Sequence, residues 1–161
     1  MLVDALTALQ DWEPVAALRQ SRWTYASVNA AHIVGLALLF GAIVPLDLRL
    51  MGWRRTVPIR AMVRTLLPLA ITGLVLAVAA GLLLFSIRAV EYAGTTLFQV
   101  KMALVACALL NSLFLHRAAQ WEAQQTIVGD APPLRLRMAG ALSIGLWLSV
   151  IVCGRMLAFV D

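Results

Sequence analysis

Residues 24–50 read TYASVNAAHIVGLALLFGAIVPLDLRL, with Trp23 directly before this stretch and Trp53 shortly after it. An α-helix crosses the apolar part of a bilayer in about 20 residues, and tryptophan side chains favour the headgroup level at its two ends. The stretch therefore predicts a transmembrane helix, which is the first span of the chain.

Similar apolar stretches follow in residues 61–87, 95–116 and 138–160. The chain of 161 residues is 62% hydrophobic and only 13% charged, which is more apolar than a soluble domain. These lengths leave room for a single transmembrane domain over residues 1–161. The sequence thus predicts an all-α integral membrane four-helix bundle.

The first twenty or so residues have a different pattern. Leu6, Leu9, Val15 and Leu18 recur near one side of a helix, and Pro14 interrupts it. This pattern predicts a short N-terminal amphipathic helix that lies at the membrane interface.

The arginines of the chain predict its orientation in the membrane. They gather between spans one and two and between spans three and four, as Arg54, Arg55, Arg60, Arg117, Arg135 and Arg137. The positive-inside rule places both of these loops in the cytoplasm and both termini outside. Because the net charge of +5 arises in such loops, membrane lipid is the expected anionic neighbour and nucleic acid is not expected.

Small residues repeat every four positions in two spans. The repeats are Gly73, Ala77 and Gly81 in span two, and Ala141, Gly145, Ser149 and Cys153 in span four. Helices in membranes associate by close approach of their backbones across small residues. The repeats predict either a tight bundle or a homo-oligomer, and the pattern does not choose between them.

Ionisable side chains at membrane depth mark candidate sites, because they are costly unless they are paired or line a cavity. With a rise of about 1.5 Å per residue, His32, Lys101 and Arg155 lie roughly 12, 9 and 8 Å from the outer ends of their spans. The three side chains therefore share one outer layer. His116 falls roughly 20 Å away along the membrane normal, so the two histidines cannot hold the same cofactor within one chain.

This outer layer holds an imidazole and two cations without a carboxylate at the same depth. Glu91 in the short outer loop is a candidate partner for Lys101 or Arg155, and Asn29, one turn from His32, is a candidate to orient the ring. The excess of positive charge favours an anionic or electron-rich ligand.

Haem b or a related porphyrin fits this chemistry. In this hypothesis His32 is the metal ligand, while Lys101, Arg155 and Asn29 complete the cofactor-binding site and the cations pair with propionates. The function would be electron transfer or porphyrin oxidation by a haem-dependent oxidoreductase, with a quinone or another redox protein as partner.

Three other interpretations stay open. One is a copper or other metal handling and transport protein, with His32 and Met102 as ligands. Another is a structural subunit of a larger membrane complex. In the third, His32 is a hydrogen-bonded core residue, while Lys101 and Arg155 extend to the headgroups.

Two further polar residues have simpler expected roles. Asn111, near the Lys101 face of span three, is expected to make an interhelical hydrogen bond. His116 is expected at the cytoplasmic interface, where Asp47 lies at the same level.

Several short segments resemble a known group of proteins. They are residues 32–50 (HIVGLALLFGAIVPLDLRL), 72–73 (TG), 81–85 (GLLLF), 98–101 (FQVK), 110–111 (LN) and 154–155 (GR). The chain resembles an uncharacterised family of small bacterial four-span membrane proteins, which is similar in turn to the copper-resistance D membrane domain and to the four-span protoporphyrinogen oxidase. The resemblance implies a place in the bacterial inner membrane, and a functional pair formed by His32 and Lys101 with haem b. The oxidase's Trp-x-Lys-x-x-His pattern is not found before His32.

Overall fold

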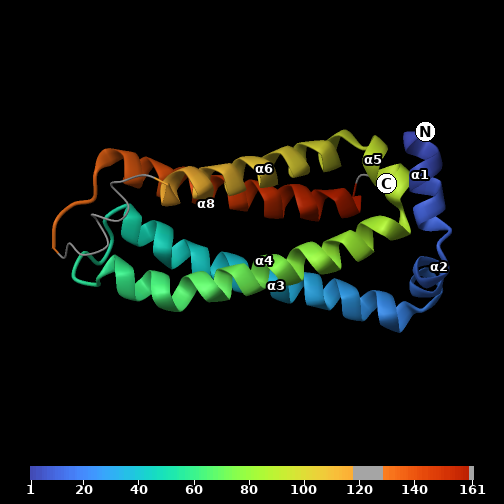
Figure 1. Ribbon diagram of the computed structural model, residues 1–161, viewed down its shortest axis with the longest axis horizontal. Helices are drawn as coiled ribbons and strands as arrows, with labels where there is room; N and C mark the ends of the chain where they lie inside the picture. Colours follow the sequence, from blue (N-terminus) through green and yellow to red (C-terminus); the bar gives the residue numbers. More distant parts are fainter. Residues whose placement is uncertain (118–128, 160–161) are drawn as a thin grey trace.

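The computed structural model describes residues 1–117 and 129–159 of the chain (Figure 1). Its helices are α1 (Leu2–Gln10), α2 (Glu13–Gln20), α3 (Arg22–Leu50), α4 (Ile59–Ile87), α5 (Ala89–Gly94), α6 (Thr96–His116) and α8 (Leu134–Met156), followed by the 3-10 turn η1 (Leu157–Phe159). Within these residues there is no β-strand. The prediction of an all-α fold is confirmed.

Four of these helices are long and apolar enough to cross a membrane, namely α3, α4, α6 and α8 continued by η1. The first three agree with the predicted spans to within a few residues. Helix α8 begins at Leu134, earlier than the predicted residue 138, because the helix continues past its apolar part through Arg135 and Arg137. The predicted end of this span at residue 160 lies outside the described residues.

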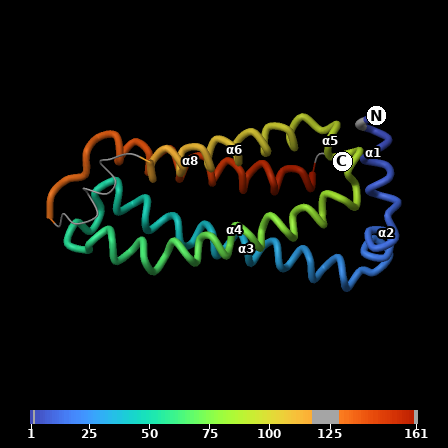
Figure 2. Tube along the Cα trace, viewed as in Figure 1, coloured from blue at the N-terminus to red at the C-terminus, as the bar shows by residue number. Residues whose placement is uncertain are grey.

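The long helices form two antiparallel pairs, α3 with α4 and α6 with α8, and α3 and α8 join the pairs. Figure 2 shows all four running along the long axis, with α1 and the end of α8 at one end. We call this the terminal end. The opposite end, where the chain turns from α3 to α4 and from α6 to α8, is the loop end.

Glycines bring α3 and α4 into backbone contact. A β-carbon added at Gly73 would lie 2.5 Å from the backbone nitrogen of Leu39, and Leu39 itself is only 3% exposed. The repeat of small residues on α4 is therefore a packing face within the chain, which is one of the two outcomes that the sequence left open. The main core lies beside this contact and consists of Leu39, Ala42, Ala70, Ala108, Trp147 and Val150.

The repeat on α8 behaves differently. A β-carbon at Gly145 would meet nothing within 4 Å, so the middle of this repeat does not pack against another described helix. Helix α8 buries a neighbouring face instead, which carries Gly140, Ser143, Trp147 and Val150. Of the two outcomes that the sequence left open for this repeat, packing within the chain is not observed at Gly145, because small residues on two faces of a helix do not reveal which face is covered. A homo-oligomer that uses the exposed face stays a prediction.

The N-terminal segment forms two helices that lie across the terminal end (Figure 1). Pro14 stands in the first turn of α2, where its missing N–H breaks no hydrogen bond. Val15 and Leu18 are buried against Ile87, and the Gln10 side chain donates a hydrogen bond to the Ile87 carbonyl at 3.2 Å. The N-terminal segment therefore packs on the end of the bundle with its apolar side and leaves its polar side exposed.

One buried arginine, Arg49, contacts the connection between α3 and α4 at the loop end. Arg49, only 1% exposed, donates from Nε to the Val57 carbonyl at 2.7 Å and from Nη2 to the Arg55 carbonyl at 3.1 Å. These bonds satisfy carbonyls of the connection between α3 and α4, and they hold this connection against the end of the bundle.

Candidate functional site

His32 lies on α3 and faces α4. Its Nδ1 atom is 2.7 Å from the Ala77 carbonyl oxygen, and a β-carbon at Gly81 would lie 3.0 Å from its Cε1 atom. The ring therefore rests against the small-residue face of α4. Because a carbonyl oxygen can only accept a hydrogen bond, Nδ1 is the donor, and in the neutral ring Nε2 keeps its lone pair.

The sequence did not single out the group that orients this ring. Asn29 was the expected partner, but its side chain is exposed one turn earlier, and the structure assigns the Nδ1 contact to the Ala77 carbonyl. Ala77 belongs to the repeat of small residues on α4, which signals that the backbones approach closely. That repeat is the only signal in the sequence that points to this carbonyl.

Lys101 reaches the same layer from α6. It lies close enough to His32 to interact with it electrostatically, and it also lies near Cys153 on α8. A β-carbon at Gly154 would lie 3.6 Å from the Lys101 Nζ atom, so the ammonium group rests against the backbone of α8. The structure thus brings together His32 and Lys101, which the sequence placed in one layer from helix geometry.

Arg155 lies one residue beyond this contact but turns away from it. Its side chain is exposed, and its guanidinium stacks over the Phe159 ring at 4.9 Å from the ring centroid. Glu91, the expected carboxylate partner of this layer, pairs with Arg88 instead, whose Nε atom donates to Glu91 Oε2 at 2.5 Å. That expectation was wrong because Arg88 is only three residues away on the same helical turn.

The two cations of this region therefore lack a carboxylate partner among the described residues. In the described part of the chain, no ion pair involves Lys101 or Arg155. Phe85 and Phe98 stack at 5.2 Å between their centroids and connect the end of α4 to the start of α6 beside this region. An anionic ligand would balance the charge here.

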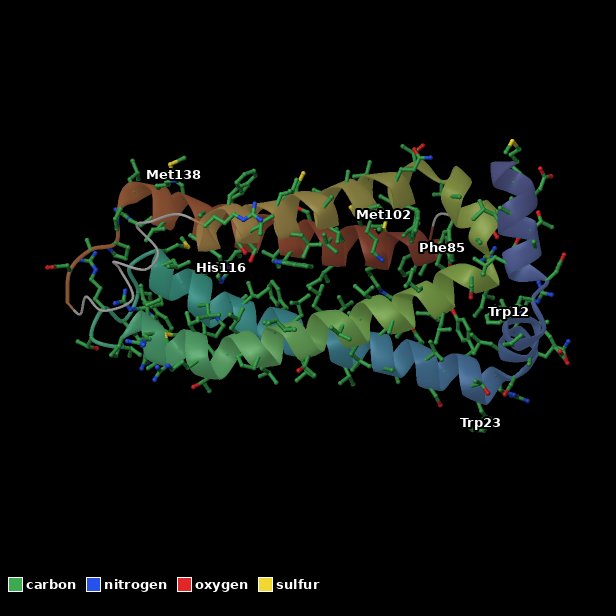
Figure 3. All side chains as sticks on the ribbon, viewed as in Figure 1. Trp12, Trp23, Phe85, Met102, His116 and Met138 are labelled. Atoms are coloured by element: carbon green, nitrogen blue, oxygen red, sulfur yellow. The ribbon has the colours of Figure 1, made fainter. Side chains whose placement is uncertain are left out.

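The other histidine lies apart from this layer. His116 ends α6 at the loop end, and its Nδ1 atom is 2.7 Å from the Ser112 carbonyl oxygen. Figure 3 shows His116 and Met102 well separated along the bundle. His116 shares a cavity with Asp47, in agreement with the level expected for both residues.

The ligands suited to a metal ion alone are sparse. Among residues 1–117 and 129–159, no group of three or more His, Cys, Asp and Glu side chains is close enough to hold a metal ion. Met102, the candidate soft ligand, is 48% exposed. A porphyrin would need fewer protein ligands than a metal ion alone, because a single imidazole can hold its iron.

Comparisons of the chain with models of protein families, with curated proteins and with solved structures found no match.

Proposed function

We propose that this protein binds haem b or a related porphyrin through His32 in the terminal half of the bundle, and serves in electron transfer or porphyrin oxidation. The observation that carries this proposal is the hydrogen bond between His32 Nδ1 and the Ala77 carbonyl. Histidines that ligate metals commonly donate their other ring N–H to a backbone carbonyl, which fixes both the tautomer and the ring orientation. His32 has this arrangement, with Nε2 left for iron.

The charges beside His32 support an anionic cofactor. Lys101 is within electrostatic reach of the ring, and Arg155 is exposed near the same end of α8. Haem propionates pair well with such cations at the edge of a membrane. In this proposal Lys101 and Arg155 neutralise the propionates. Asn29, which is exposed one turn before His32, completes the cofactor-binding site.

Haem would supply reversible one-electron chemistry at its iron. His32 would hold the group through Nε2, and the Ala77 carbonyl, which accepts from Nδ1, would polarise the ring and make Nε2 a stronger donor. The apolar surroundings of α3 and α4 limit access of water. Helices α1 and α2 cover the same end of the bundle.

The proposed location is the bacterial inner membrane, with the loop end in the cytoplasm and the terminal end outside. The arginines of the loop connections support this orientation through the positive-inside rule. Membrane lipid is then a constant neighbour, and a quinone or another redox protein is the proposed electron partner.

The test is the visible absorption spectrum of the full chain, purified in detergent from cells with ample haem. We expect a Soret band that is lost in His32→Ala and kept in His116→Ala, which removes the other histidine at the opposite end of the bundle. A colourless wild-type preparation would overturn the haem proposal. Copper found by metal analysis of that sample would favour metal handling instead.

A further inference from the structure

A second polar region lies in the loop half of the bundle, away from His32. It is a cavity of about 120 Å³ between the two helix pairs, with walls from α3, α4, α6 and α8. Its polar lining residues are Asp47, Asn111, Ser112, His116 and Ser143. The cavity is large enough for several water molecules and small for a drug-sized ligand.

Asp47 is the unusual member of this lining. It is only 5% exposed, and its Oδ2 atom has no hydrogen-bond partner. The burial arises from a close contact between helices, since a β-carbon at Gly140 would lie 2.8 Å from the Asp47 carbonyl oxygen. Ser143, one turn further along α8, interacts with the carboxyl group.

No fixed cation among the described residues neutralises this carboxyl group. The lining residues of α4 are apolar, with Val63, Leu67 and Ala70 among them, and α8 contributes Ser143 and Trp147. Arg49 on α3 directs its Nε and Nη2 atoms to loop carbonyls, and its Nη1 atom is buried without a hydrogen-bond partner and forms no ion pair with Asp47. His116 is the titratable side chain that α6 places in the same cavity.

An ionised carboxylate in such surroundings is costly, and the cost is removed when the group takes up a proton or binds a cation. Hard metal cations take about six or more oxygen ligands in proteins. Apolar side chains form most of this lining. A proton needs only the carboxylate itself, so it is the ligand that fits the cavity.

We propose that Asp47 is a proton-binding site that exchanges protons with the loop side of the membrane by way of His116. His116 is exposed at the end of α6 and also lines the cavity, so its imidazole connects the buried carboxyl group with the water at the loop end. The exchange is a simple proton transfer. A proton from this water passes to the Asp47 carboxylate and returns by the same route, without an oxidant or reductant. This site does not depend on the haem proposal.

Infrared spectroscopy of the full chain in lipid vesicles tests the proton site. At neutral pH exposed aspartates, whose ordinary pKa is about 3.9, are ionised, so a carbonyl band of a protonated carboxyl group reports a shielded acid. We expect this band in the wild type, its loss in Asp47→Asn and its persistence in Asp130→Asn, where the carboxylate removed is exposed. Asp47→Glu keeps an acid at this position, so it should move the band without removing it.

Two results would overturn the site itself. One is a wild-type spectrum without the band. This includes a band that appears only after sodium and potassium are removed, because a metal cation would then be the ligand of the Asp47 carboxylate. The other is a band that survives unchanged in both Asp47 variants.

The route is tested by the rate at which the band shifts after transfer to D₂O. His116→Leu should slow this shift several-fold relative to the wild type, whereas Arg60→Leu, an exposed loop-end control on α4, should not. An unchanged rate in His116→Leu would exclude His116 as the connection.

Discussion

Gly35 on α3 lies directly against Ala77 on α4, where an added β-carbon would be 2.5 Å from the Ala77 backbone nitrogen. Backbone cannot move aside as a flexible side chain can, so Gly35→Ala must separate the two helices locally. We expect a loss of about 1–3 kcal/mol in the free energy of unfolding, which is typical of overpacking. Thermal unfolding in detergent, followed by circular dichroism, measures the loss.

Gly41→Ala is the matched control, because Gly41 lies on the same helix and its added β-carbon would meet nothing within 4 Å. Alanine favours a helix over glycine by about 1 kcal/mol, so this variant should be as stable as the wild type or slightly more so. Equal destabilisation by both substitutions would contradict the close packing of α3 on α4 at Gly35.

Gly81→Val tests the ring position that the haem proposal requires. The β-carbon alone would lie 3.0 Å from His32 Cε1, and the valine branches add further bulk. The ring must then move from the Ala77 carbonyl, and loss of such an orienting bond typically costs about 10–100-fold in affinity for the metal group. Haem titration of the purified protein, followed at the Soret band, should show this loss. Gly145→Val, in open space on α8, should bind haem as the wild type does.

Asn111→Ala removes the hydrogen bond from Asn111 Nδ2 to the Ala139 carbonyl, which is 3.0 Å long and joins α6 to α8. Hydrogen bonds of this kind between membrane helices contribute about 0.6–2 kcal/mol. We expect a lower unfolding temperature in the same detergent assay. Asn29→Ala, at an exposed position on α3, should leave the unfolding temperature nearly unchanged.

The spans were predictable because the length of an apolar stretch is a local property of the sequence. The shared layer of His32 and Lys101 was also predictable, since a constant rise per residue and alternating directions determine depth. Sequence did not reveal that the Ala77 carbonyl orients His32, because every residue carries the same backbone oxygen. Nor did it reveal that α8 packs through Gly140 and leaves Gly145 open, because both faces carry small residues.

Arg49→Leu should loosen the connection between α3 and α4. The substitution removes charge-assisted bonds to the Val57 and Arg55 carbonyls, and each such bond contributes about 1.5–3 kcal/mol. We expect trypsin to cleave after Arg54 or Arg55 faster than in the wild type, as followed by mass spectrometry of the fragments. Arg60→Leu, which removes an exposed arginine nearby, should leave the cleavage rate unchanged. Equal rates in wild type and Arg49→Leu would mean that Arg49 does not hold this connection.

The proposed orientation predicts opposite labelling of two exposed positions. Asp11 lies between α1 and α2 at the terminal end, and Asp130 lies in the connection that precedes α8 at the loop end.

For the labelling experiment, Asp11 and Asp130 are each replaced by cysteine in a background in which Cys107 and Cys153 are alanine. A membrane-impermeant maleimide added to cells whose inner membrane is intact and whose outer barrier is permeable should label Asp11→Cys and leave Asp130→Cys unlabelled. Disruption of the membrane should then allow both to react, which shows that each thiol is accessible. The reverse pattern would place the arginine-rich loop end outside, and His116 would then connect Asp47 with the outer solution rather than with the cytoplasm.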